Sequence, residues 1–180
     1  MSFPCSWTHP PRQPEALFFE RAAQRQSGLT KPTGSLGRLE TVAIQLAGLQ
    51  GTDEPTLDHI QISVFVGDHG ICEEGISAYP QAVTAQMIAN FANGGAAISV
   101  LAKSLGARLE VVNLGTVSDV APGLTNVVDA RIAPSTRNFA VTDAMTIEQV
   151  GSALNHGDAA AERAASSGCQ LFIGGKMGIG

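Results

Sequence analysis

Few cysteines, few aromatic residues and no cluster of basic residues characterise this 180-residue sequence. Its three cysteines, Cys5, Cys72 and Cys169, are odd in number and widely spaced, which argues against a disulfide framework or a zinc site and fits reduced thiols in a cytoplasm. Aromatic residues make up only 5%, so a core must be built from alanine, valine, isoleucine and leucine. The net charge of −5 provides no electrostatic footprint for nucleic acid.

Long apolar runs are also missing. No stretch approaches the length that a bilayer-spanning helix needs, and the first residues lack the basic and apolar regions of a signal peptide. We therefore expect a cytoplasmic protein with no membrane partner. With 44% hydrophobic and 15% charged residues, the composition is that of a globular domain.

Residues 1–52 predict a leader followed by a helical pair, which we assign to a smaller lobe. Residues 14–28 begin with proline, carry acidic residues early and end with glycine, which are helix start and stop signals. Residues 35–51 place apolar side chains at helical spacing along one face, with Ser35 as a candidate N-cap.

Residues 53–180 alternate strands with helices and predict an α/β core. The apolar runs and their flanking turns predict strands within 59–70 (ending at Gly67), at 108–116 and at 169–175, and helices at 80–107 and 146–168. Thr146 is a candidate cap, and a loop rich in proline, glycine and asparagine precedes it. This order predicts a Rossmann-like parallel sheet with helices on both faces.

Ligands of open parallel sheets bind beyond the carboxyl ends of the strands, so we look for chemistry there. After the first strand come Asp68 and His69, with Glu73 and Glu74 close behind. These groups could share a divalent cation, but adjacent side chains usually diverge and no third ligand has suitable spacing. We expect no metal and a hydrogen-bonded turn that shapes the floor of a pocket.

Two further stretches are candidate binding elements. The glycine-rich stretch 174–180 offers backbone N–H groups without bulky side chains, which suits an anion, although a tight turn explains the glycines equally well. Its spacing fits neither a P-loop nor a dinucleotide fingerprint. In the second stretch, a flat apolar ring could stack on Tyr79 and Met87 while Gln86 orients it, unless Met87 is a core residue.

Four stretches together resemble one family, the nicotinate-nucleotide–dimethylbenzimidazole phosphoribosyltransferases of cobalamin biosynthesis. They are "LTKPTGSLGRLE" (29–40), "GDHGICEEGISAYPQAVTAQMIANFANGGAAISVLA" (67–102), "RNFAVTDAMT" (137–146) and "GGKMGIG" (174–180). The resemblance implies a transferase that uses no cofactor, moves phosphoribosyl from nicotinate mononucleotide to 5,6-dimethylbenzimidazole, and forms a homodimer.

The resemblance also implies site residues. Tyr79, Pro80, Gln86 and Met87 would line the benzimidazole pocket. The phosphoribosyl group would contact a glycine loop that consists of Gly174, Gly175, Lys176, Met177, Gly178, Ile179 and Gly180. The family's catalytic glutamate has no counterpart here, so no catalytic residue is assigned to this chain. Glu73 and Glu74 are interpreted as solvated residues of their loop.

At position 176 the sequence departs from the family pattern. Family members usually read "GEMGIG" followed by Asn-Thr-Thr and a helix, whereas Lys176 replaces the acid and the continuation is missing. We therefore expect a truncated member that is inactive alone. Two alternatives stay open, namely a non-catalytic protein that binds an aromatic base and an enzyme that uses a different acceptor base.

Overall fold

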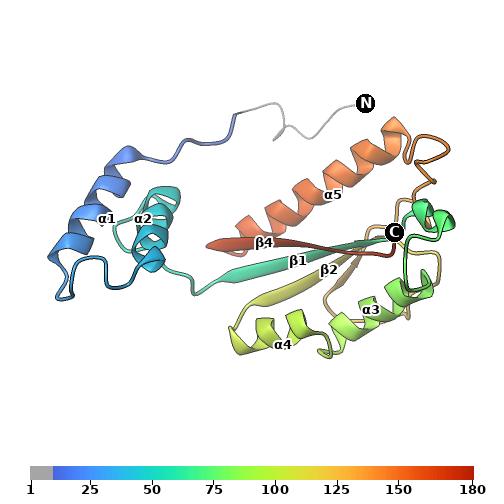
Figure 1. The fold of residues 1–180 in the computed structure, drawn as a ribbon, viewed down its shortest axis with the longest axis horizontal. Coiled ribbons are helices and arrows are strands. Elements are labelled where there is room, and N and C mark those ends of the chain that lie inside the picture. The colour runs from blue at the N-terminus through green and yellow to red at the C-terminus, as the bar shows by residue number, and fades with distance from the viewer. Residues whose placement is uncertain (1–9) are drawn as a thin grey trace. The chain divides into compact units, whose positions relative to one another are not determined.

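The computed structural model describes residues 10–180, which form two compact units, Pro10–Leu57 and Asp58–Gly180 (Figure 1). Cys5 lies outside the described residues. Within residues 10–180, no helix is both long and apolar enough to span a bilayer.

The smaller unit is a pair of packed helices, α1 (Ala16–Gly28) and α2 (Arg38–Gln50), as the apolar spacing predicted. The helices approach closely at Gly48, where an added Cβ would collide with the ring of Phe19. The expected cap at Ser35 is wrong. Ser35 lies in a turn in which its N–H donates to the Pro32 carbonyl, and α2 begins after Gly37, whose φ of 55° suits glycine.

The larger unit is built on a four-stranded parallel sheet, which confirms the predicted α/β class. Its strands are β1 (Ile60–Gly67), β2 (Arg108–Gly115), β3 (Val127–Asp129) and β4 (Leu171–Met177), in the order β3-β2-β1-β4. β1 is an inner strand that pairs along its length with both neighbours: Val64 lies opposite Val111 of β2 and Gly175 of β4.

β3 was not predicted from the sequence. It contributes only three residues from the loop rich in proline, glycine and asparagine, too few to give a periodic signal. Its pairing is nevertheless regular, since Val111 lies opposite Val127. The residue before the strand, Asn126, has a φ of 58°. β3 extends the carboxyl edge of the sheet and positions residues 130–136 beside it.

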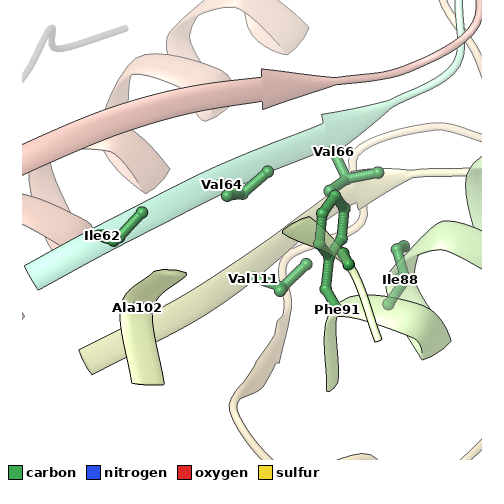
Figure 2. Packing of buried hydrophobic residues seen from close by; sticks show 8 residues of the cluster. Ile62, Val64, Val66, Ile88, Phe91, Ala102 and Val111 are labelled. Atoms are coloured by element: carbon green, nitrogen blue, oxygen red, sulfur yellow. The ribbon is translucent and has the colours of Figure 1, made fainter. Parts of the chain in front are cut away.

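Helices cover both faces of the sheet. On one face lie α3 (Ala82–Ala92) and α4 (Ala97–Ser104), and on the other lies α5 (Ile147–Ser166) (Figure 1). The apolar core fills the α3–α4 face, where the side chains of Val64, Val66 and Val111 meet Ile88 and Phe91 (Figure 2). Burying side chains of this size contributes roughly 1.5–3 kcal/mol each, so this layer anchors the unit.

The α5 face is more polar than the α3–α4 face. Ser63 of β1 is fully buried, and its hydroxyl donates to the Glu110 carboxylate of β2 at 3.1 Å. The guanidinium of Arg163 on α5 donates two hydrogen bonds to the same carboxylate, at 2.7 and 3.0 Å. Small residues such as Ala160 let α5 lie close to the sheet. The predicted cap is confirmed, because Thr146 and Gln149 form a reciprocal capping box.

Candidate functional site

The strands β1, β2 and β4 end at one edge of the sheet, where parallel-sheet proteins hold their ligands. The segments that follow these strands are tied together by backbone hydrogen bonds. The Asp68 N–H donates to the Gly115 carbonyl, and the His69 N–H donates to the Ile179 carbonyl, both at 3.0 Å. Figure 1 accordingly shows the C-terminal end of the chain beside the segment that follows β1.

Two glycines let these segments touch. An added Cβ on Gly178 would collide with the carbonyl oxygen of Gly67, and one on Gly115 would collide with that of Ala133. Gly115 also has a φ of 144°, which L side chains rarely adopt. Any larger residue at either position would push the strand ends apart, so these glycines are required by the geometry of the edge.

Asp68 forms the floor of this edge and is only 2% exposed. Its carboxylate accepts from the Thr84 hydroxyl of α3 at 2.5 Å and from the Val117 N–H after β2 at 2.9 Å. Its backbone carbonyl also accepts from Thr136 at 3.1 Å. These bonds confirm the predicted hydrogen-bonded turn, and residues 10–180 contain no group of three or more metal-ligating side chains.

A second side-chain hydrogen bond holds the loop after β1. The Asn138 amide donates to the Glu74 carboxylate at 2.6 Å and joins the 3₁₀ helix Gly70–Glu74 to the segment 137–146. Glu74 is exposed, in agreement with its interpretation as a solvated residue, but its carboxylate also has this hydrogen-bond partner. The sequence gives no local indication of this hydrogen bond, because Asn138 lies 64 residues after Glu74.

His69 and Lys176 lie together at the edge. Burial lowers the pKa of His69, and the positive charge of Lys176 lowers it further, against a smaller opposing effect of Asp68. The ammonium of Lys176 donates to the Gly178 carbonyl at 3.2 Å. Near neutral pH the edge therefore holds a neutral imidazole beside a cation.

A cavity of about 160 Å³ opens at this edge on the α5 side of the sheet. Most of its wall is apolar, and Asp68, His69 and Lys176 are its charged or titratable residues. The other lining residues are Phe65, Val66, Gly67, Leu114, Gly115, Ile132, Ala133, Ser135, Thr136, Met145, Gln149 and Ala153. The cavity is therefore suited to a small apolar or aromatic group that carries a polar substituent.

The predicted base-binding residues lie on the other side, at the start of α3. Tyr79 is 67% exposed, and Pro80 and Gln86 are exposed as well. Met87 is half-buried and packs against the apolar core, while its sulfur accepts from the Asn90 amide at 3.8 Å. Gln81, next to Pro80, donates to the His69 carbonyl at 3.2 Å and joins this patch to the carboxyl edge.

The predicted glycine loop is partly strand. β4 continues through Met177, so Gly174, Gly175, Lys176 and Met177 pair with β1 residues 63–66, and only 178–180 follow the strand. Glycine lowers strand propensity, but the ladder hydrogen bonds need only the backbone, and the β1 partner imposes the extended form. The sequence-based boundary at 175 was therefore wrong.

Of the predicted site residues, Lys176 is the one that lines the cavity. Sequence reasoning missed the apolar wall. The alternation of β1 could have indicated that Phe65 faces away from the apolar core, because Val64 and Val66 on either side of it face that core. No such indication exists for Ile132 and Ala133, since their position depends on the short strand β3.

The fold and this site define a class of enzyme. A family model described as phosphoribosyltransferase matches residues 12–180, and the chain belongs to that family. Cys72 and Cys169 are unpaired thiols, and an α/β enzyme of this kind needs no disulfide.

Curated relatives give a more particular likeness. The chain is 59% identical to the nicotinate-nucleotide–dimethylbenzimidazole phosphoribosyltransferase of Pseudomonas putida KT2440, over 89% of this chain and 46% of that protein. It is 54% identical to the protein of the same name from Pseudomonas aeruginosa LESB58, over 97% of this chain and 49% of that protein. The chain thus spans about half the length of the curated relatives it matches.

A solved structure agrees with these relatives. The crystal structure of CobT from Thermus thermophilus matches with a TM-score of 0.86 at 42% sequence identity, over 91% of this chain and 49% of that chain.

Proposed function

We propose that the chain contributes the substrate-binding part of a phosphoribosyltransferase that moves phosphoribosyl from nicotinate mononucleotide to 5,6-dimethylbenzimidazole. The products are nicotinate and α-ribazole 5′-phosphate. The observation that carries the proposal is the 59% identity to a relative of that name over 89% of this chain. The convergence of Asp68, His69 and Lys176 at the carboxyl edge supports it.

The reaction sets clear physical demands. Nicotinate leaves from a pyridinium ring, so its departure neutralises a positive charge and needs no general acid. The remaining demands are an anchor for the 5′-phosphate, alignment of the two rings about the ribose, and a base for the benzimidazole N–H. Alignment matters most, since well-oriented groups reach effective molarities of about 10⁵–10⁸ M.

Residues of this chain meet the first two demands in the proposal. The backbone of residues 174–180 contacts the phosphoribosyl group at Gly174 and Gly175, where an added Cβ would meet only ordinary van der Waals neighbours, whereas Gly178 and Gly180 pack against Gly67 and His69. Tyr79 and Met87 hold the benzimidazole ring by stacking, with Pro80 beside them, and Gln86 orients it by a hydrogen bond. The general base belongs to the part of the relatives that lies beyond the matched half.

Binding by the 180-residue chain is the first test. We expect 5,6-dimethylbenzimidazole to bind in calorimetry, and Gln86→Ala to weaken its Kd about 2–10-fold, the effect of one lost hydrogen bond. Gln24→Ala, an exposed glutamine of α1, is the matched control and should leave Kd unchanged. Equal affinities for all three proteins would contradict the assigned pocket.

Turnover is the second test. We expect negligible release of nicotinate from the chain alone, and restored release after co-expression with the C-terminal half of the Pseudomonas putida relative. Binding of the base without turnover in the complemented sample would instead support a non-catalytic binding protein. Turnover with another base would identify a different acceptor, since a flat pocket discriminates a methyl group by only about 1–3 kcal/mol.

The proposal also includes an oligomeric state and a cellular location. We infer a homodimer, because α2 presents exposed Leu39 and Leu49 that a second copy would cover. We also infer a cytoplasmic location from the unpaired thiols of Cys72 and Cys169. Light scattering on the purified chain tests the dimer, which a strictly monomeric mass would rule out.

A further inference from the structure

We propose that Gln81 is a positioning residue that holds the start of α3 against the end of the stretch 174–180. The start of α3 carries the acceptor-base patch, which consists of Tyr79, Pro80, Gln86 and Met87. The inference rests on the proposed function, in which this patch holds the benzimidazole ring and the stretch 174–180 contacts the phosphoribosyl group. It adds the connection that sets the position of one substrate relative to the other.

Gln81 is the residue immediately before α3. Its backbone takes part in the first turn of the helix, since its carbonyl accepts from the Thr84 N–H at 2.9 Å. Its half-buried side chain turns back toward the end of β1, where its amide donates to the His69 carbonyl at 3.2 Å. The side chain therefore joins the helix to a strand end that precedes it by 12 residues in the chain.

The peptide groups of His69 carry the connection onward to the stretch 174–180. The carbonyl of His69 accepts from Gln81, and the N–H of His69 donates to the Ile179 carbonyl at 3.0 Å. Gly180 packs against the same residue, because an added Cβ there would collide with the His69 Cβ and lie 2.9 Å from its carbonyl oxygen. A displacement of His69 therefore displaces the end of the stretch as well.

A second hydrogen bond joins α3 to the end of β1. The hydroxyl of Thr84, which is fully buried, donates to the carboxylate of Asp68 at 2.5 Å. One bond alone would leave the start of the helix free to pivot, whereas bonds to the consecutive residues Asp68 and His69 fix its orientation. Loss of the Gln81 bond should therefore leave the fold intact and allow the base patch to move.

The proposed reaction makes this orientation important. A ring nitrogen of the base must approach the ribose carbon from which nicotinate leaves, so the two substrate-binding elements must keep a fixed separation. Reacting atoms need to be held about 3–3.5 Å apart, and a misplacement of about 1 Å can lower the rate roughly 100-fold. A hydrogen bond that sets this separation should affect the rate more than the affinity.

Amide hydrogen exchange of the ligand-free 180-residue chain, measured by NMR, tests the connection itself. Gln81→Met keeps the length of the side chain and removes its donor. We expect the His69 amide to exchange about 2–10-fold faster, the effect of one lost hydrogen bond. The Asp68 amide, which donates to the Gly115 carbonyl, should keep its rate. Gln24→Met, at an exposed position of α1, is the matched control and should change neither amide.

Gln81→Glu separates the hydrogen bond from packing. Glutamate has the shape of glutamine but presents a carboxylate to the His69 carbonyl, so His69 should exchange faster than in Gln81→Met. If the side chain only filled space, glutamate would behave like the wild type, and that result would overturn the proposal. Far-UV circular dichroism of each variant checks that the helix content is kept.

The effect on the reaction is measured after co-expression with the C-terminal half of the Pseudomonas putida relative. We expect Gln81→Met to lower kcat about 10–100-fold and to leave the KM of both substrates within about 3-fold, because the alignment is lost while the substrate contacts are kept. A raised KM for the base with an unchanged kcat would mean that Gln81 binds the base directly, which would overturn the positioning role.

The outcomes separate this inference from the proposed function. If 5,6-dimethylbenzimidazole does not bind, or complementation restores no turnover, the proposed function fails, and hydrogen exchange still decides whether Gln81 connects α3 to Ile179 through His69. If the base binds and turnover is restored, but Gln81→Met keeps the wild-type exchange rate and kcat, the proposed function stands and the role of Gln81 is overturned.

Discussion

Replacing Asp68 by alanine tests whether this carboxylate holds the strand ends in place. Asp68 is 2% exposed and its two bonding partners come from different elements, Thr84 on α3 and Val117 after β2. Asp68→Ala removes the shared acceptor and leaves both donors behind. We expect a lower free energy of unfolding and weaker ligand binding at the carboxyl edge.

The magnitude follows from the two orphaned donors. The buried Thr84 hydroxyl loses its partner at a cost of about 1–3 kcal/mol, and the bond of the half-exposed Val117 N–H, which water can replace, contributes about 0.5–1.5 kcal/mol, so Asp68→Ala should cost roughly 1.5–4.5 kcal/mol. Thr84 is fully buried, so water cannot replace the lost acceptor there. Thr84→Val removes the hydroxyl and keeps the shape, so in that background Asp68→Ala orphans only one donor.

A double-mutant cycle with urea unfolding, followed by circular dichroism at 222 nm, measures this difference. We expect the two substitutions to be non-additive by about 1–3 kcal/mol, as is usual for groups in one hydrogen-bonded network. Thr142→Val, at an exposed position, is the control and should change stability by less than about 0.5 kcal/mol. Additivity within about 0.5 kcal/mol would refute the reasoning.

Three smaller predictions concern the core, a helix cap and pH. Ile88→Ala should lower the free energy of unfolding by about 2–5 kcal/mol, whereas Ile147→Ala, at a residue 65% exposed, should have little effect in the same urea titration. Thr146→Ala removes the capping box and should cost about 1 kcal/mol in thermal unfolding; an unchanged melt would count against the cap. The lowered pKa of His69 means that the unfolded state binds this proton first, so stability should fall as pH drops through about 6.5. His69→Gln should flatten that part of the pH profile, and an identical slope would contradict the assignment.

Periodicity predicted the elements of this fold because most of its segments are long enough to repeat a pattern. α5 buries one face, and β1, although it is buried on both faces, alternates apolar residues with Gln61 and Ser63, so the spacing of their apolar residues carries the signal. β3 has three residues, and its strand character comes from pairing with β2. β4 is longer than predicted for the same reason. Its glycines indicate a loop, but pairing with β1 keeps the segment extended as far as Met177.

The candidate site was harder to predict than the fold, because its contacts join residues far apart in the chain. Asp68 was recognised as a turn residue from its place after a strand, but its partner Val117 lies 49 residues away. The cavity depends on Phe65, Met145 and Ala153, which carry no chemical motif and come together only in the folded sheet. Local patterns therefore indicate which edge is used, and packing decides which side of that edge is hollow.

The pairing of β4 with β1 has a consequence for the order of folding. His59 and Gln170, which bond beside this pair, are 111 residues apart, whereas Ser63 and Glu110 of the β1–β2 pair are 47 apart. Closing the longer loop costs more chain entropy, so we expect β1 and β2 to pair first and β4 to dock late. The bond from the His69 N–H to the Ile179 carbonyl can form only after that docking. The carboxyl edge should therefore be completed in the last stage of folding, and substitutions in β4 should accelerate unfolding more than they slow folding.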